Sequence, residues 1–393
     1  MMGGMWEAEL TARMNLWWRG EVALPVDDAV AWLRGQRLLA LMGWRAEQTG
    51  WDLPIELAHE IRLRRIRIGA GLTWVEQQLR ALGETALELG ITVVLVKGAA
   101  AGQVYPAPWM RPFGDIDLLA GPGETQRLFE ALLAAGYEQE AGTEGMRGWH
   151  LPPLVPPGGR ATGGTRVEIH PALAQEGGRW LFTLAEWQDG LQPLPNTPGL
   201  WVPAAVDHAL YIVHHAVIHH ELEMGLQGAA DLWFLTAGWG EGEWEALANA
   251  AEGAGMTRAV GLLAALTAWF WDAPDYEGAR RFPTPPDEVL APAQGVMAGV
   301  RRRERMPRAW RDAESWDLLG ALKYLRVVLL GDTGQLSELP LRARVRYHIK
   351  RPAELWRNHG KAVWGLLTGK PAARDAWAEA RALQGWLRGE KSV

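Results

Sequence analysis

The sequence of 393 residues contains no cysteine. This absence excludes disulfides and thiolate metal sites, and it agrees with the cytoplasmic location that we expect. No apolar run approaches the roughly 20 residues of a membrane-spanning helix, because Arg, Glu, His or Gly interrupts each candidate. The first residues, MMGGMWEAELTARM, lack a basic stretch followed by an apolar one. We therefore expect neither a signal peptide nor a membrane partner.

The overall composition, with 48% hydrophobic and 22% charged residues, is that of a globular protein. The length allows two or three domains. The net charge of −6 hides an asymmetry. Residues 301–393 hold 20 Lys and Arg against 10 Asp and Glu, which leaves 20 against 36 for residues 1–300. The basic segment either attracts a phosphate-rich or acidic partner or docks on the acidic part of its own chain.

Residues 1–90 have the apolar spacing of helices. One helix is predicted over Asp27–Trp44, with a single buried stripe, and a second over Pro54–Leu89. Gly90 is placed to end the second helix, because glycine adopts the left-handed conformation that commonly follows a helix. A helix that ends in glycine and leads into the apolar run Ile91–Val96 predicts the start of an α/β unit.

Two short apolar runs, Val93–Val96 and Ile116–Ala120, predict buried strands. Between them, a loop that carries Pro106, Pro108, Pro112 and Gly114 delivers Asp115 and Asp117 at the start of the second strand. Side chains two residues apart on a strand point to the same face, so both carboxylates project together. Two neighbouring like charges need a divalent cation, a basic partner or open water.

Downstream, Gly121–Gly123 breaks the strand and a helix follows, with Leu128, Leu132 and Leu133 in its core-facing stripe and Gly136 at its end. Alternation in Arg166–His170 predicts another strand, on which Glu168 and His170 share one face. The remaining expected segments are a loop or hairpin at Pro152–Gly164, helices at Val206–Leu222, Gly228–Thr236 and Trp244–Trp271, a linker at Phe282–Pro292, and a basic helical module after Arg301.

Three acids from two strands, Asp115, Asp117 and Glu168, are therefore candidates for one site. Such carboxylates suit Mg²⁺, which binds through a few carboxylates and substrate phosphates. Two ions close together would stabilise both the attacking and the leaving oxygen of a phosphoryl displacement.

Further candidate contacts for phosphate surround these acids. Lys97 supplies a positive charge and Gly98 a backbone that phosphates can approach closely. Arg111 is either a polyphosphate contact or an ion-pair partner of one of the aspartates. His170 is either a base or phosphate contact or a structural histidine.

Four histidines at positions 214, 215, 219 and 220 form a second cluster. His215 and His219 lie one helical turn apart on one face, a spacing that zinc sites use. The glutamate that directly follows the first histidine in zinc proteases is absent, and no third ligand is near in sequence. We therefore expect core or hydrogen-bonded histidines, of which one, or Asp231 on the next helix, could face the cleft.

The segment KGAAAGQVYPAPWMRPFGDIDLLAGPGETQRLFEALLAAGY at residues 97–137 resembles the uncharacterised nucleotidyltransferase family of the polymerase β-like nucleotidyltransferase superfamily. The resemblance extends through VEIHPAL and through HHAVIHHELEMGLQGAADLWFL, and it covers about residues 60–240. It implies that Asp115 and Asp117 are the metal-binding pair and Glu168 the third carboxylate. It also implies that Gly98 lies in the nucleotide-phosphate turn, although the wider superfamily has Gly-Ser where this chain has Lys97-Gly98.

The predicted fold class is α+β, with a mixed sheet of the nucleotidyltransferase fold flanked by helices, N-terminal helices and a largely helical C-terminal region. The expected domains are an N-terminal helical segment at 1–59, the catalytic core at 60–200, a cleft-closing helical domain at 201–285 and a basic module at 286–393. We expect transfer of a nucleoside monophosphate from an NTP, with ATP as the expected substrate, to a hydroxyl-type acceptor of unidentified nature. Two Mg²⁺ ions would take part, and pyrophosphate would leave.

Two other functions stay open. One is a phosphotransferase that modifies a peptide or natural product on the same scaffold. The other is a non-catalytic nucleotide-binding or toxin–antitoxin-type interaction protein. Nucleic acid is not the favoured acceptor, because basic and aromatic residues do not interleave tightly.

Overall fold

The computed structural model describes residues 17–19, 26–141, 143, 150–159, 164–176, 179–299, 368 and 370–390. The chain divides into two compact units. Unit 2 spans Ala12–Phe282 and contains the sheet and the helices around it. Unit 1 combines Met1–Thr11 with Pro283–Val393. The domain boundaries expected from the sequence stay predictions; the first of them, at 59/60, falls inside one continuous helix.

The described part of unit 2 contains a mixed sheet of seven strands in the order β3-β4-β5-β2-β1-β9-β8. Its centre consists of β1, β2 and β5, where β1 is antiparallel to β2 and β2 is parallel to β5. The strand predictions hold closely here, since β1 has the expected bounds and so does β5. The strands are β1 (Val93–Val96), β2 (Asp115–Leu119), β3 (Glu138–Gln139), β4 (Leu154–Val155), β5 (Arg166–His170), β8 (Gln192–Pro193) and β9 (Leu200–Val202).

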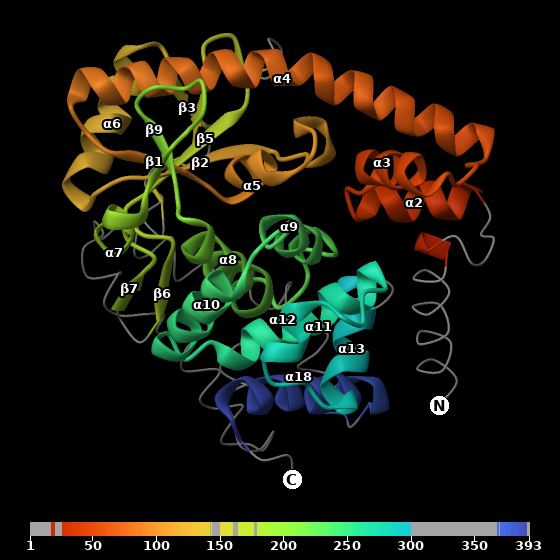
Figure 1. Ribbon diagram of the computed structural model, residues 1–393. Coiled ribbons are helices and arrows are strands. Elements are labelled where there is room, and N and C mark those ends of the chain that lie inside the picture. The colour runs from red at the N-terminus through yellow and green to blue at the C-terminus, as the bar shows by residue number, and fades with distance from the viewer. Residues whose placement is uncertain are drawn as a thin grey trace. The chain divides into compact units, whose positions relative to one another are not determined.

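The two faces of this sheet have different partners, as the alternation of side chains requires. One face packs under α4 (Ile55–Leu89) and α6 (Pro122–Ala134) and forms the core. Figure 1 shows α4 along this side and α8 and α9 on the other side. The core residues are Val93 and Leu95 of β1, Ile116 and Leu118 of β2, Val167 and Ile169 of β5, Leu79, Leu82 and Ala86 of α4, and Leu128, Phe129 and Leu132 of α6. The opposite face is left for polar residues of β2 and β5.

Helix α4 is longer than the sheet it covers, because 35 residues at about 1.5 Å each extend roughly 50 Å. Its C-terminal half packs on the core, and its N-terminal half packs against α2 (Val26–Gly35) and α3 (Leu39–Thr49). Gly90 ends it with a φ of 63°, as predicted. On α6, Leu133 is 39% exposed, so its place in the core-facing stripe was predicted wrongly.

The single helix predicted over Asp27–Trp44 is wrong, because α2 ends at Gly35 and α3 begins at Leu39. Arg37 lies between them with a φ of 59°, a left-handed conformation that breaks the helix. The neighbouring Gln36 Oε1 accepts a hydrogen bond of 2.9 Å from the Leu226 N–H. A contact distant in sequence therefore accompanies the break that the local apolar spacing did not predict.

The remaining elements of unit 2 are mostly helical. Those between β1 and β2 are α5 (Lys97–Ala101), η1 (Gly102–Val104) and η2 (Pro108–Met110), and β6 (Ala174–Glu176) pairs with β7 (Arg179–Leu181). The others are α7 (Leu184–Trp187), η4 (Gln188–Gly190), α8 (Ala205–Val213), η5 (His214–His219), α9 (Gln227–Leu235), α10 (Glu241–Gly253), α11 (Thr257–Trp271) and α12 (Glu277–Arg281). The mixed sheet and these helices confirm the predicted α+β fold class.

In unit 1 the described helices are α13 (Asp287–Met297) and α18 (Pro371–Arg388), which contact each other. The linker predicted over Phe282–Pro292 is wrong for its second half, because α13 begins at Asp287 and includes Pro292. Most of the basic helical module predicted after Arg301 lies outside the described residues. Throughout the part of the chain that the structure describes, each helix is too short or too polar to cross a membrane.

Candidate functional site

The polar face of the sheet brings acids from two strands together. In the β2–β5 pair, Asp117 lies directly opposite Glu168, and Asp115 lies opposite Arg166. Because the strands are parallel and in register, all of these side chains point to the face away from α4. The convergence of acids from two strands, expected from the sequence, is therefore present.

Asp117, Glu168 and His170 form the closest group. Among the described residues they are the one set of three acids or histidines whose potential ligand atoms all lie within 4.8 Å of one another. His170 Nε2 lies 2.9 Å from Asp117 Oδ1 and 3.8 Å from Glu168 Oε2. All three residues are buried. His170 therefore lies beside the candidate acids.

Lys97 supplies a positive charge to this group. Its Nζ lies 2.5 Å from Asp117 Oδ1 and 3.3 Å from His170 Nε2. Lys97 has a φ of 54°, in the region that favours glycine, directly where β1 ends and α5 begins. A non-glycine residue there is strained, and such strain concentrates at functional sites.

The electrostatics of the two carboxyls differ. Burial opposes the ionised form of Asp117, but the charge of Lys97 and the hydrogen bond with His170 outweigh it and lower the pKa of Asp117 to about 2. Burial and the neighbouring Asp117 charge raise the pKa of Glu168. Burial also lowers the pKa of His170. At neutral pH, Asp117 is therefore ionised and His170 is neutral, and Glu168 is the carboxyl that takes up a proton more readily.

Asp115 has a different neighbour. Arg166 Nη2 lies 3.1 Å from Asp115 Oδ2 and 2.8 Å from Glu168 Oε1, and its Nη1 lies 3.2 Å from Glu140 Oε2. Arg166 thus bridges three carboxylates at the edge of the site. No role was predicted for Arg166 from the sequence, although its position two residues before Glu168 on the same face was the available signal.

Arg111 is tied to a helix and not to Asp115 or Asp117, the two aspartates considered as its ion-pair partners. Its Nε and Nη2 donate to the two carboxylate oxygens of Asp231 on α9, at 2.7 and 2.8 Å, and its Nη1 donates to the Pro112 carbonyl at 2.8 Å. The Tyr105 hydroxyl donates to the same carboxylate at 2.6 Å. Arg111 and Asp231 are both buried. The pair fastens the β1–β2 loop to α9.

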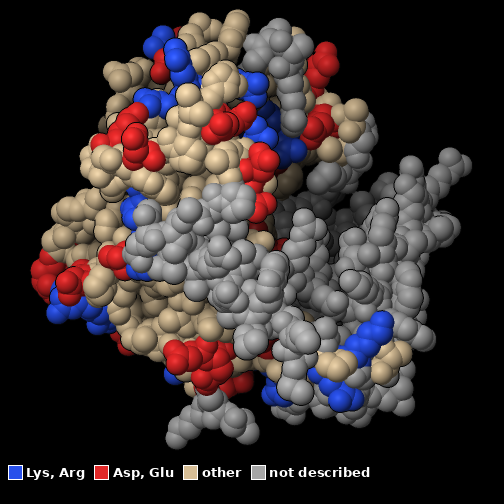
Figure 2. Space-filling model, turned by 90° about the vertical axis from the view of Figure 1, so that its right-hand side faces the viewer, with Lys and Arg blue, Asp and Glu red and all other residues tan. Residues whose placement is uncertain are grey.

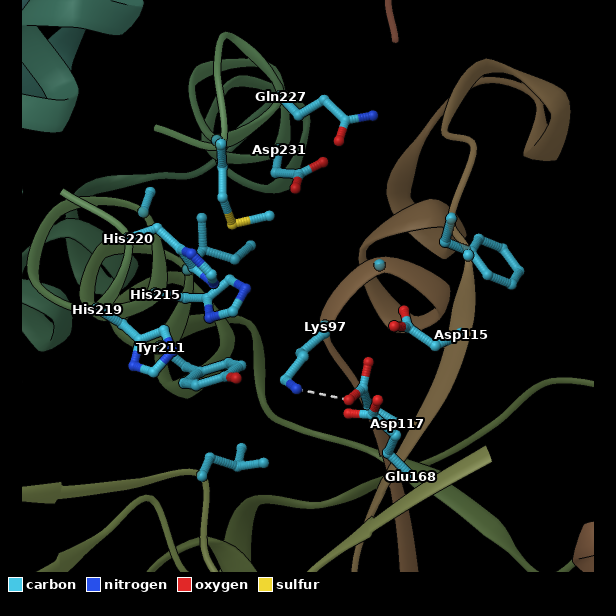
Figure 3. A pocket seen from close by; sticks show the side chains of 18 of the residues that line it. Lys97, Asp115, Asp117, Glu168, Tyr211, His215, His219, His220, Gln227 and Asp231 are labelled. Atoms are coloured by element: carbon cyan, nitrogen blue, oxygen red, sulfur yellow. Dashed lines mark hydrogen bonds and ion pairs between the residues drawn. The ribbon is translucent and has the colours of Figure 1, made fainter. Parts of the chain in front are cut away.

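A cavity of about 400 Å³ lies over the acids and is lined by residues from the sheet, the β1–β2 loop and the helices α8 to α9. Figure 3 shows Asp115, Asp117 and Glu168 on one side of this cavity, and Tyr211, His215, His219 and His220 on the other side, with Lys97 reaching between them. The sequence-predicted residues in its lining are Lys97, Gly98, Arg111, Asp115, Asp117, Glu168 and His170. One cavity therefore contacts every candidate residue of the prediction.

The histidine cluster lies on an unusual turn. The helix predicted over Val206–Leu222 ends at Val213, and η5 continues it as a π-helix in which the His220 N–H donates to the His215 carbonyl at 3.0 Å. In an α-helix, residues five apart are about 140° apart around the axis. The wider turn instead brings the His215 and His220 ring centroids to 4.5 Å. Such turns are frequent at functional sites.

His215 and His219 share one face, as predicted, with parallel rings whose centroids are 5.6 Å apart. Two left-handed residues, Glu221 and Leu222, follow η5. The zinc interpretation gains no third ligand, because the set of three described above is confined to Asp117, Glu168 and His170 among the described residues. The cluster lines the cavity through His215, His219 and His220.

Other lining residues were not identified from the sequence. They include Arg37, His150, Tyr211 and Gln227. Arg37 reaches the cavity from the break between α2 and α3, and His150 Nε2 lies 3.8 Å from Glu168 Oε2. No local signal marks these residues, because only the folded chain brings them to the cavity.

The side chains at the floor of the cavity, Asp117, Glu168 and His170, are suitable ligands for a divalent cation. Two carboxylates and an imidazole lie within reach of one another, and Asp117 is ionised at neutral pH. Burial raises the pKa of Glu168 and the Asp117 charge raises it further; a cation would relieve the repulsion between the two carboxylates. Oxygen ligands favour Mg²⁺ or Mn²⁺, while an imidazole ligand suits later transition metals as well.

Comparisons with known proteins bear on the family. No match to this chain is found among curated proteins. The model of the family described as uncharacterised nucleotidyltransferase matches residues 23–272, which include every residue of the cavity lining. The match covers more than half of the chain. The chain therefore belongs to the uncharacterised nucleotidyltransferase family.

Proposed function

We propose that this protein transfers a nucleoside monophosphate from an NTP, with ATP as the first choice, to a hydroxyl-type acceptor and releases pyrophosphate. The observation that carries the proposal is the pair Asp117 and Glu168, which lie opposite each other on adjacent parallel strands at the floor of a cavity. Membership of a nucleotidyltransferase family supports the class of reaction.

The floor would hold the metal. We propose Asp117 and Glu168 as its main ligands, with His170 and Asp115 as the next candidates. A bound Mg²⁺ would neutralise phosphate charge and increase the electrophilicity of the α-phosphorus. Two such ions remain our proposal for the full site.

Three residues around the floor would bind the polyphosphate. Lys97 is flexible and half-buried, so its ammonium can balance Asp117 or contact a phosphate oxygen. A Cβ on Gly98 would lie 2.8 Å from the Phe113 Cβ and 3.4 Å from Arg111 Nη1, so the backbone there is tightly packed beside a cation. Arg111 uses three of its five N–H groups on Asp231 and Pro112. We propose that a remaining N–H contacts phosphate while the side chain stays anchored.

Nucleic acid is not our preferred acceptor. On the face in Figure 2, basic and acidic side chains of the described residues are interspersed. On α4, Arg65 pairs with Glu47 at 2.5 Å, and Glu60 pairs with Arg34 of α2. Such mixed surfaces give less of the electrostatic attraction on which phosphate-backbone binding depends. A small molecule, peptide or protein hydroxyl is the acceptor class that we favour.

Label transfer tests this proposal. The protein is incubated with Mg²⁺, a small-molecule cell extract and ATP labelled at either the α- or the γ-phosphorus. Nucleotidyl transfer moves the α-label onto an acceptor and releases the γ-label in pyrophosphate. Transfer of the γ-label alone would instead establish a phosphotransferase.

The matched variants are Asp117→Asn in the cavity and Asp189→Asn on the exposed turn η4. We expect the first to abolish label transfer, because the reaction depends mainly on positioning and charge neutralisation. The second should transfer label at the wild-type rate. Near-wild-type turnover by Asp117→Asn would show that the proposed site is wrong.

A further inference from the structure

The helical side of the cavity contains two buried polar groups that lack a hydrogen-bond partner among the described residues. Tyr211 of α8 is 1% exposed and Gln227 of α9 is 3% exposed, and both line the cavity. Within the described residues, neither the Tyr211 hydroxyl nor the Gln227 Nε2 has a hydrogen-bond partner. Buried hydroxyl and amide groups nearly always have one, because desolvating them without a partner is costly. A bound molecule would supply the missing partners.

The position of Tyr211 places this molecule next to the reaction floor. Figure 3 shows its hydroxyl pointing toward Lys97, Asp117 and Glu168. Burial raises the pKa of Tyr211 well above its ordinary value, and the charges of Asp117 and Glu168 raise it further. The group that attacks the α-phosphorus must also lie at this floor, whereas a nucleobase is held away from it by the ribose.

The helical side of the cavity, called the wall below, carries almost no net charge. The segment from Ala205 to Leu235 contains no Lys or Arg, so it offers no cation to a phosphate. Its one carboxylate in the cavity lining, Asp231, is already bound by Arg111 and Tyr105. The remaining polar lining consists of the imidazoles of His215, His219 and His220, the phenol and the amide. Burial and the neighbouring His220 lower the pKa of His215 well below its ordinary value, so this ring is uncharged at neutral pH.

We propose that this wall, formed by Tyr211, His215 and Gln227, is the acceptor subsite and that it takes an uncharged, polyhydroxylated small molecule of the sugar or polyol class. Several separated hydroxyls on one molecule match a phenol, an imidazole and an amide spread over two helices. Flat rings suit the apolar faces of a sugar. A cationic acceptor would find no free carboxylate on this wall, and an anionic one would find no cation on it, because the cations that line the cavity, Arg37, Lys97 and Arg111, belong to other elements. Calling the bound molecule the acceptor rests on the proposed nucleotidyl transfer. Its binding to this wall can be measured without that reaction.

Binding of matched probes tests it. Glucose, glucosamine and glucose 6-phosphate share one ring and differ in charge, and myo-inositol adds a second neutral probe. Their binding is measured by ligand-observed NMR, with and without Mg²⁺ and a non-hydrolysable ATP analogue. We expect the neutral probes to bind at least tenfold more tightly than the charged ones. Failure of both neutral probes to bind, or tighter binding of a charged one, would overturn the proposal.

The variants are Tyr211→Phe and Tyr276→Phe. Both remove one tyrosine hydroxyl, but Tyr276 is only partly buried, bonds to Thr236 and lies outside the cavity lining. Loss of one hydrogen bond predicts about three- to tenfold weaker binding of the neutral probes by Tyr211→Phe, with the dissociation constant of the ATP analogue unchanged within twofold. Tyr276→Phe should change neither. Weaker nucleotide binding by Tyr211→Phe would assign the wall to the nucleotide and refute the acceptor subsite.

A third variant, Gln227→Leu, removes the amide at similar size. It should weaken the neutral probes by a comparable factor, and unchanged probe binding by both cavity variants would also refute the proposal. Absence of ATP-analogue binding by the wild-type protein would count against the proposed function and not against the subsite, because the probes are also measured without nucleotide.

Discussion

Replacing Asp231 with alanine will destabilise unit 2 strongly, because the carboxylate has two buried partners. Arg111 donates to both of its oxygens, and Tyr105 donates to one of them. The side chains of Arg111 and Asp231 are 7% and 6% exposed. Without the carboxylate, a guanidinium would remain buried with no countercharge and a hydroxyl with no acceptor.

The expected cost follows from these contacts. Removing one partner of a buried ion pair costs about 3–5 kcal/mol, because the other charge stays buried. The unsatisfied hydroxyl adds to this in the same network, so the terms do not simply sum. For a unit of this size, we expect the melting temperature to fall by about 10 °C.

Thermal unfolding followed by circular dichroism measures this effect. The matched control is Glu47→Ala, which removes the partner of Arg65 in an exposed pair and should cost less than about 1 kcal/mol. The double variant Arg111→Met with Asp231→Leu removes both charges and should recover most of the lost stability. A loss of less than about 1 kcal/mol in Asp231→Ala would refute the buried-pair reasoning.

The same double variant separates the two roles of Arg111. If a remaining N–H of Arg111 contacts phosphate, the folded double variant should bind a non-hydrolysable ATP analogue at least tenfold more weakly than the wild type. Calorimetry measures this affinity. Unchanged affinity would leave Arg111 with a structural role alone.

Three further predictions concern the floor and the turn beside it. The pKa of Asp117 is about 2 in the folded protein, against an ordinary value of 3.8. Ionised Asp117 therefore stabilises the fold by about 2 kcal/mol above pH 3.8, and this stabilisation is lost as the pH falls through 2. The stability of metal-free Asp117→Asn should consequently fall less steeply than that of the wild type in this pH range. The pKa of Glu168 is raised in the fold, so its contribution to folding stability is present below pH 4.5 and is lost as the pH rises. Glu168→Gln should therefore raise the melting temperature of the metal-free protein at pH 7, and a lower melting temperature would contradict this reasoning. Gly98→Ala should weaken ATP-analogue binding, because the new methyl would lie 2.8 Å from the Phe113 Cβ, whereas Gly102→Ala meets only ordinary contacts and should bind normally.

Much of the sheet and of its acidic face could be predicted from the sequence. The strands β1 and β5 have distinct local signals, a short apolar run in one and a strict alternation in the other. Alternation predicts that Asp115 and Asp117 share one face of their strand and that Glu168 and His170 share one face of theirs, so the three acids could be proposed as one site. The resemblance to the family added that Glu168 joins Asp115 and Asp117 as the third carboxylate.

The helical side could not be predicted in the same detail. Apolar spacing alone marks neither the break at Arg37 nor the π-helix at His214–His219. The break is accompanied by a hydrogen bond between residues far apart in sequence, from the Leu226 N–H to Gln36. The partner of Arg111 was missed for a related reason. Asp231 lies 120 residues away in sequence, and no local pattern connects it with the β1–β2 loop. No local sequence signal indicates that Tyr211 and Gln227 place polar groups in the cavity; only the folded structure shows this.

The central claim is that Asp117 and Glu168 hold a divalent cation beside a bound nucleotide. Titration of Mn²⁺, followed by electron paramagnetic resonance in the presence of a non-hydrolysable ATP analogue, tests it directly and needs no acceptor. We predict that the wild-type protein binds Mn²⁺ and that Asp117→Asn binds it at least tenfold more weakly, while Asp189→Asn binds it normally. Equal binding by the wild type and Asp117→Asn, or no binding by the wild type, would contradict the claim.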